Sequence, residues 1–511
     1  MGRSLHRLTR PTPPRTSMTP PASTLVHRFT RRVAFGLRAD AQLPADPLNW
    51  AQAQVAQVPP IDILERDGTR RADLPEGMRL LWEMDEVMTA FHRHQEAERA
   101  SFAKGRSLPR EQYAQERRRE IEIPYHRLEH WKEAQARAST ALHGAAPVFE
   151  RFWHFWANHF MVAPGNQNND TLVGPFQRSL RPKMLGNFRD LLWHATVHPA
   201  MLVYLDNNEN TGPRSRAVRE GWTRRSVNEN LGRELLELFS LSPEGGYTQR
   251  DVEATTLLLT GWRDMKPDRH HKPGVPLGTY FDFNHHEPGA QTVMGKTYTA
   301  FVRQDSKLAD LVTDLAQHPA TARHLARKLC VYFIDDEPPP QAVAHVEQVF
   351  RQSRGDLPAV HRAVIEMCWA HIASTRKLAS PEAWLLQCLT LTGLDLPRAI
   401  PVDDRGGIKT HYLLGDLGQP IPRCPQPNGW PIRSVDWISK ELMDRRVRYA
   451  GLLSSDLGRQ PAAMVRMLEV QSERHLAEGS AEQALVRSAL ARRDLRSANT
   501  LLHVSPSLLW A

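Results

Sequence analysis

The sequence predicts an all-α protein, a multi-helix globular domain with a long irregular loop rich in His, Gly and Pro, and at most a minor β-hairpin. Apolar residues recur at a period of about 3.6 through most of the chain, and clear strand runs are rare. Proline and glycine stand where the periodic stretches end. Hydrophobic residues make up 41% of the 511 residues, and the thirteen Trp add to a core of ample size.

The chain divides into a tail and an ordered body. Residues 1–24 are rich in Arg, Pro, Ser and Thr, and we expect a disordered basic tail. Ordered structure should begin near Leu25, with a helical domain over residues 25–454 and a C-terminal helical segment, 455–511, packing on the same domain. Residues 75–142 predict an insertion of long, charged, partly exposed helices.

The densest helical pattern follows this insertion. Phe149, Phe152, Trp156 and Phe160 form one apolar stripe, and Leu231, Leu235 and Leu238 form another. Helices are expected at about Pro147–Phe160, Gly186–Val197, Pro199–Leu205 and Asn228–Leu241.

Local signals refine the region around the Asn228–Leu241 helix. Gly232 costs about 1 kcal/mol relative to Ala inside a helix, so we expect a neighbouring element to approach it closely. Thr248 with Asp251 predicts a capping box, and Gly261 should end the helix that follows. Residues 264–300 are rich in Pro, Gly, His and aromatics and predict a long loop, with any hairpin expected within Gly278–Tyr298.

The second half of the chain returns to helical spacing. A passage rich in Pro and Gly, Pro397–Pro431, interrupts it, and helical segments continue to about Leu502. The predicted helices before this passage are Lys307–Ala316, Pro319–Ile334, Pro339–Arg354, Leu357–Ala370 and Pro381–Leu391.

Charge is unevenly distributed along the chain. The net charge is +9, but residues 1–40 carry eight Arg and one Asp, so the rest of the chain is nearly neutral. A broad nucleic-acid surface is therefore not indicated. Basic tails of this kind favour solvated disorder. Contact of the tail with nucleic acid or anionic lipid is the alternative.

The cysteines and the apolar runs of the sequence indicate the compartment of the protein. The four Cys include no C-x-x-C pair, which favours buried thiols over a zinc ribbon or disulfides. No run of eighteen apolar residues predicts a membrane span. The start lacks a signal-peptide core, and the apolar run after Arg31-Arg32 is too short for a twin-arginine signal. These features predict a cytoplasmic protein.

His159 and Glu234 are the candidate catalytic residues, because each is a proton- or metal-competent side chain on or beside an apolar helix face. Together with Glu237 and His286 (or His285) they form the candidate metal ligands, a set that suits iron, manganese or zinc. Each has a structural alternative. His159 is then a core histidine bonded to a backbone carbonyl, Glu237 pairs with Arg233, and Glu234 pairs with an Arg of another helix.

Other polar groups have weaker signals. His194 and His198 are four residues apart but lack the Glu of a zincin motif. The oxygen-rich Asp206–Asn210 stretch suits turn formation better than calcium binding, because the EF-hand Gly and distal Glu are absent. A polar cluster is expected from Asn158, Asp206, Asn207, Asn228 and Glu229. The aromatic side chains expected in the core rather than in a ligand platform are Trp153, Trp156, Trp193 and Trp222.

Several ordered blocks resemble a bacterial family called domain of unknown function 1800, over about Leu25 to Ser454. They include FTRRVAFGL at 29–37, LRPKMLGNFRD at 180–190, PAMLVYLDN at 199–207 and GYTQRD at 246–251, with the two helices that carry His159 and Glu234. The resemblance implies no established activity. It implies a protein partner from a sulfatase-like family often encoded alongside, and an export signal, which we do not expect in this chain.

Two departures from the family pattern bear on mechanism. Phe239 stands where relatives often have His. The segment His286-Glu287-Pro288-Gly289-Ala290-Gln291 replaces a His-Asp-x-Gly-x-Lys pattern, so any role for that Lys is absent here.

Two function classes remain open. The first is a metal-dependent hydrolase or oxidoreductase, with a divalent metal between the helices of His159 and Glu234 and the His285-His286 loop as a lid. The second is a non-catalytic helical partner or scaffold of the sulfatase-like protein, in which the polar blocks are buried structural networks.

Overall fold

A computed structural model describes residues 22–64, 69, 81, 83–105, 125–164, 169–264, 274–300, 305–393, 414–421, 423–453 and 461–511. Over these residues the chain is predominantly helical with two small antiparallel sheets, so the predicted all-α class is confirmed. None of the helices described is long and apolar enough to cross a membrane. All four cysteines are buried free thiols, as expected.

The N-terminal half supplies helices of very different lengths. Its longer helices are α1 (Ala22–Val33), α2 (Pro47–Ala53), α3 (Met84–Gly105), α5 (Tyr125–His143), α6 (Pro147–His159), α7 (Asp170–Ser179), α8 (Phe188–Val197), α11 (Asn230–Glu237) and α12 (Gln249–Leu259). Shorter elements are η2 (Arg181–Leu185), α9 (Pro199–Tyr204), η3 (Asn207–Glu209) and α10 (Arg216–Arg219).

The C-terminal half begins with the four strands β1 (Trp262–Asp264), β2 (Thr279–Phe281), β3 (Gln291–Val293) and β4 (Lys296–Tyr298). Helices follow at α13 (Ser306–Gln317), α14 (Pro319–Phe333), α15 (Pro340–Gln352), α16 (Leu357–His371), α17 (Pro381–Thr392), η4 (Ser434–Trp437) and α19 (Lys440–Leu453). The last helices are α20 (Pro461–His475), α21 (Ala481–Ala491), α22 (Leu495–His503) and α23 (Pro506–Leu509).

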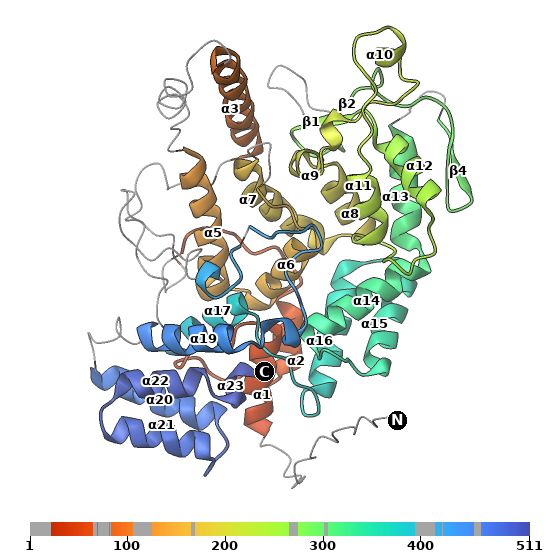
Figure 1. The fold of residues 1–511 in the computed structure, drawn as a ribbon. Helices are drawn as coiled ribbons and strands as arrows, with labels where there is room; N and C mark the ends of the chain where they lie inside the picture. The colour runs from red at the N-terminus through yellow and green to blue at the C-terminus, as the bar shows by residue number, and fades with distance from the viewer. Residues whose placement is uncertain are drawn as a thin grey trace, which may run out of the picture.

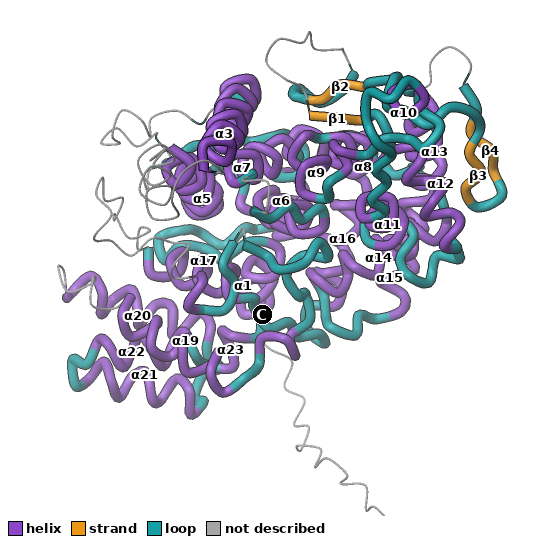
Figure 2. Tube along the Cα trace, turned by 45° about the horizontal axis from the view of Figure 1, so that its top comes forward, coloured by secondary structure: helices purple, strands orange, loops and turns teal. Residues whose placement is uncertain are grey.

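The largest core surrounds α6, which lies inside the molecule with α8, α11, α14 and α16 around it (Figure 1). A second core joins α5, α17 and α19, and a third lies within α20–α22 and reaches Leu391 of α17. Figure 2 shows α19–α23 gathered at one end of the molecule, while α8–α13 and the strands lie toward the other. The C-terminal helices therefore pack on the body through α1 and α17.

Several helix boundaries have the local causes that the sequence indicates. Thr248 and Asp251 form the capping box of α12, and Gly261 follows its end with φ +86°. A Cβ on Gly232 would lie 2.3 Å from Thr256 Oγ1 of α12, so the predicted close approach is present. The β3–β4 hairpin lies within the predicted range, and β1 pairs with β2 in a second small sheet.

Two predictions about residues 222–241 were wrong. The helix predicted over Asn228–Leu241 is shorter and spans Asn230–Glu237. At its start, Asn228 Oδ1 accepts a hydrogen bond from the Asn230 N–H. At its end, Phe239 N donates to Glu234 O, which makes a wider turn than the helix has. Trp222 is not a core residue: 55% of its surface is exposed, on the loop after α10.

Basic residues near the start of the ordered chain are buried rather than solvated. The helix α1 begins at Ala22, three residues before the predicted start, and residues 1–21 of the predicted tail lie outside the described residues. Arg28 and Arg32 donate to backbone carbonyl oxygens, including Thr375 O. Much of α5 beyond Trp131 is also buried, which brings Arg137 to the interior.

Candidate functional site

His159, at the end of α6, is fully buried. Its Nε2 lies 3.3 Å from Phe239 O, and its Nδ1 is 2.9 Å from Lys328 Nζ. Burial, with the charge of Lys328 and the nearby His324, holds the pKa of His159 well below its ordinary value. The neutral His159 ring accepts a hydrogen bond from Lys328 at Nδ1 and donates its single N–H, at Nε2, to Phe239 O. This is the contact expected of a core histidine.

Glu234 and Glu237 lie together on α11, both half-buried. Burial, and then the charge of Glu237, raise the pKa of Glu234 to about 7. Glu237 accepts a 2.9 Å hydrogen bond from Tyr247 Oη, and Arg233 pairs with Glu229 at 3.1 Å rather than with Glu237, so that predicted pair was wrong.

In the part of the chain that the structure describes, no ion pair or hydrogen bond is formed by the Glu234 carboxylate. The alternative of a buried Arg partner from another helix therefore lacks support, and no described side chain bonds to both Glu234 and His159.

His286 lies in a different place, at the end of α12. Its Nδ1 is 2.8 Å from Thr260 O, and burial, with the charge of Lys307, lowers its pKa to about 4. His285 lies 3.0 Å from Asp282. His286 and His285 thus have their own partners, and the described residues contain no group of three or more His, Cys, Asp or Glu able to hold a metal ion. A metal site remains a prediction.

The second histidine pair has structural partners. His194 Nε2 lies 2.7 Å from Ser179 Oγ, and His198 Nδ1 accepts from Ala200 N at 3.2 Å as the N-cap of α9. Burial lowers the pKa of His194 to about 3 and that of His198 well below its ordinary value.

The predicted polar cluster is partly assembled. Asn207 Nδ2 donates to Leu259 O and Trp262 O, and Asn210 Nδ2 donates to Asn207 Oδ1 and Asn228 O. Asp206 precedes this turn with φ +57°. Glu229 accepts from Gln249 at 2.8 Å. Asn158 lies elsewhere: it exchanges two hydrogen bonds with the backbone of Trp430, at 2.7 and 2.9 Å.

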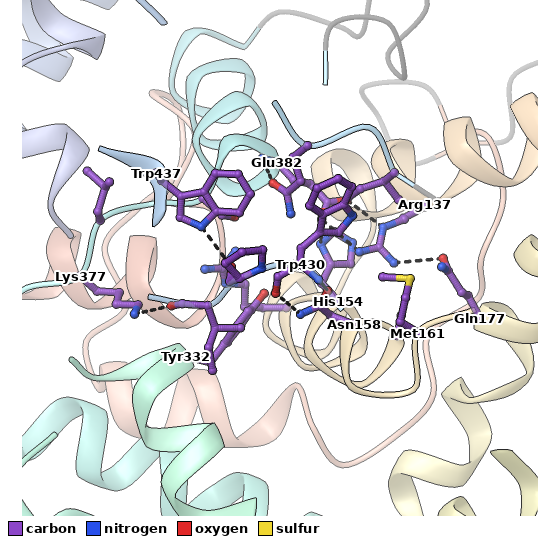
Figure 3. A pocket seen from close by; sticks show the side chains of 18 residues that line it. Arg137, His154, Asn158, Met161, Gln177, Tyr332, Lys377, Glu382, Trp430 and Trp437 are labelled. Carbon is purple, nitrogen blue, oxygen red and sulfur yellow. Dashed lines mark hydrogen bonds and ion pairs between the residues drawn. The ribbon is translucent and has the colours of Figure 1, made fainter. Parts of the chain in front are cut away.

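Asn158 lines a polar cavity where α5, α6, α14 and α17 meet the segment 419–437 (Figure 3). Its empty space, open solvent at the mouth included, is about 570 Å³. Polar and aromatic side chains dominate the wall: Arg137, Arg151, His154, Asn158, Gln177, Tyr332, Lys377, Glu382, Gln419, Trp430 and Trp437.

Two of the three cations in this wall have a counterion. Arg137 forms a two-point pair with Glu382, at 2.8 and 3.0 Å. Glu382 stands in the first turn of α17, where the helix dipole favours a carboxylate. Lys377 pairs with Asp336 and donates to Ile432 O at 2.6 Å.

Arg151, the third cation, has no such partner. Its side chain is buried, with 6% of the residue exposed, and its Nε makes no hydrogen bond. Its guanidinium carbon lies 4.8 Å from the ring centre of Tyr332 and 5.5 Å from that of Phe35. No ion pair reaches it from the residues placed by the structure. A guanidinium cannot lose its proton, so this positive charge remains in the interior.

Two more donors beside Arg151 are unused. Both ring nitrogens of His154 are buried without a hydrogen bond, and its Nδ1 is 3.5 Å from Glu382. Burial, and the charges of Arg137, Arg151 and Arg181, hold the pKa of His154 well below its ordinary value, so the ring is neutral and has one N–H to donate. The Nε1 of Trp430 is likewise buried without a partner.

This cavity was not predicted from the sequence. A signal was present, because Arg151, His154 and Asn158 follow one another by three and four residues. At 100° per residue they lie on the α6 face opposite Phe149 and Trp156, the face that an amphipathic helix turns to water. The structure covers it with α5, α17 and the 419–437 segment, whose positions no local pattern reveals.

Fold and site together define a predominantly helical protein with a cation-rich pocket. The chain matches the family model described as "Protein of unknown function (DUF1800)" over residues 28–509, and it belongs to this family, as its resemblance indicated. Comparison with curated proteins and with solved structures finds no match.

Proposed function

We propose that this protein binds a small anionic molecule, one carrying a carboxylate or phosphate group, in the cavity around Arg151. The observation that supports this most strongly is the buried guanidinium without a counterion. Burial of an unpaired ion costs several kcal/mol, so a positive charge retained in a cavity favours a ligand of opposite sign.

The surrounding groups suit such a ligand. Arg151 supplies the charge, while His154 and Trp430 each have an N–H free to donate to an oxygen. The pair of Arg137 with Glu382 fixes one wall of the cavity. The rings of Tyr332 and Trp437 offer apolar surface to the rest of the molecule.

Calorimetric titration and thermal unfolding with phosphate, citrate and acetate test the proposal. Arg151→Met removes the charge and keeps the length of the side chain. The matched control is Arg446→Met, because Arg446 is also buried and lies over a ring, 5.6 Å from that of Trp384, but outside the cavity.

At least one anion should stabilise the wild type and Arg446→Met, and should leave Arg151→Met unchanged. If no anion binds the wild type, or if Arg151→Met binds as well as the control, the proposal is wrong.

The metal-dependent hydrolase or oxidoreductase and the non-catalytic partner of a sulfatase-like protein remain hypotheses, and an anion-binding cavity is compatible with either. Elemental analysis of the purified protein separates them. Stoichiometric iron, manganese or zinc would favour the enzyme, and stable metal-free protein would favour the partner.

A further inference from the structure

The loop 211–227, which includes α10, projects from the end of the molecule opposite α20–α23 (Figures 1 and 2). Its ends are held together, because Thr211 and Ser226 exchange backbone hydrogen bonds of 2.6 and 3.4 Å. Gly212 N donates to His285 O at 2.9 Å, which fastens the loop to the turn after β2. The loop is therefore a closed, anchored projection.

The loop carries an excess of positive charge at its surface. The segment RSRAVREGWTRR, residues 214–225, contains five Arg and one Glu. Arg214 pairs with Glu287 at 2.5 Å, and Arg216 pairs with Glu220 at 2.7 Å. Arg219, Arg224 and Arg225 are exposed, and none forms an ion pair with any residue that the structure describes.

Large apolar side chains are exposed beside these arginines. The exposed fraction is 55% for Trp222, 42% for Val227 and 62% for Phe283. Trp222 N donates to Ala217 O, and Ala217 N donates to Asn284 O, both at 2.9 Å, so the Trp222 and Phe283 segments are neighbours. Exposed apolar side chains that lie on neighbouring segments and are flanked by polar residues mark surfaces that contact a partner protein or a membrane.

We propose that this loop binds the surface of a lipid bilayer rich in anionic lipid, with Trp222 and Phe283 in the interface and Arg219, Arg224 and Arg225 at the headgroups. Tryptophan favours the interface because its ring is apolar and its N–H is polar. Each arginine near an anionic leaflet adds to the attraction.

A bilayer fits this loop better than nucleic acid does. Tight nucleic-acid binding uses about six to ten phosphate contacts, and the loop has three free arginines on a protein whose remaining charge is small. The apolar side chains on a projecting tip also suit insertion among headgroups more than contact with a phosphate backbone.

Co-sedimentation of the full chain with vesicles tests the proposal. Vesicles of phosphatidylcholine with phosphatidylserine should bind the wild type, and pure phosphatidylcholine vesicles should bind it much less. Arg219→Gln/Arg224→Gln/Arg225→Gln should weaken binding about a hundredfold, because three charges are lost. The matched control is Arg487→Gln/Arg492→Gln/Arg493→Gln, three exposed arginines at the other end of the molecule, which should bind as the wild type does.

Quenching by brominated lipid tests insertion independently of affinity. The wild type should show quenched Trp fluorescence on anionic vesicles, and Trp222→Phe should lose most of that quenching while it still binds. The proposal is overturned if the wild type ignores anionic vesicles, or if both triple variants bind equally. It is also overturned if the loop arginines affect retention of a single-stranded oligonucleotide or an acidic protein but not of vesicles.

Discussion

Replacement of Arg151 by methionine should make the ligand-free protein more stable, although Arg151 contacts two aromatic rings. The variant keeps a flexible apolar stem between Tyr332 and Phe35 and removes a guanidinium that has no counterion. A buried arginine that pairs with a carboxylate behaves in the opposite way, because its removal leaves that carboxylate unpaired. Among the residues that the structure describes, no carboxylate pairs with Arg151, so none is left behind.

Two effects of opposite sign determine the size of the change. Loss of the cation–π contacts costs about 0.5–2 kcal/mol. Removal of an unpaired buried charge recovers several kcal/mol, and replacement of buried ionic groups by apolar ones is often stabilising by about 1–4 kcal/mol. The net expectation is a free energy of unfolding that rises by about 1–3 kcal/mol without anion.

Denaturant unfolding with and without the bound anion measures this balance. At a ligand concentration of 100 times Kd the wild type should gain about 2.7 kcal/mol and the variant nothing, so the variant loses its advantage. A variant that is less stable than the wild type by 3 kcal/mol or more in the absence of anion would contradict this prediction. That result would mean that the Arg151 charge is already compensated within the protein.

Three further predictions concern other parts of the molecule. The native state keeps the Glu234 proton up to about pH 7, whereas the unfolded chain releases it near pH 4.5. The free energy of unfolding of the wild type should therefore fall as the pH rises from 4.5 to 7. At pH 8 Glu234→Gln should be more stable than the wild type by about 1 kcal/mol, and equal stability at that pH would contradict this. Burial lowers the pKa of ten histidines among the described residues, including His154, His159, His286 and His361. Below about pH 6.5 the unfolded chain binds protons at these histidines and the native state does not. The free energy of unfolding measured in urea should therefore fall as the pH is lowered from 6.5 to 4.5, by about 1.4 kcal/mol per pH unit for each proton. A free energy that stays constant over this range would contradict the prediction. Gly232→Ala should destabilise the protein by up to about 2 kcal/mol, because the strain of a Cβ 2.3 Å from Thr256 Oγ1, about 1–3 kcal/mol, outweighs the gain of about 1 kcal/mol in helix propensity; a melting temperature that rises would disprove the close contact.

Elements with local boundary signals could be predicted from the sequence. The cap of α12 needs only Thr248 and Asp251, and α6 begins at a proline whose missing N–H costs nothing there. The end of α11 could not be predicted, because its turn joins Phe239 N to Glu234 O instead of continuing the regular pattern. Trp222 was misplaced because an isolated aromatic in a short loop has no periodicity to show which way it faces.

The candidate site was harder to predict for a physical reason. His159 and Glu234 stand out because they interrupt apolar stripes, and such interruptions are local. The cavity instead depends on pairing between distant segments: Arg137 meets Glu382, 245 positions later, and Asn158 meets Trp430, 272 positions later. The missing counterion of Arg151 becomes visible only once every neighbour has been placed.

Anomalous diffraction from a crystal soaked in selenate tests the central claim most directly, because selenate resembles phosphate in charge and shape and its selenium can be located. An anion site in the cavity should give a selenium peak there, with oxygens about 3 Å from the Arg151 guanidinium and within reach of His154 or Trp430. A well-occupied crystal with selenate only at other, surface positions would contradict it.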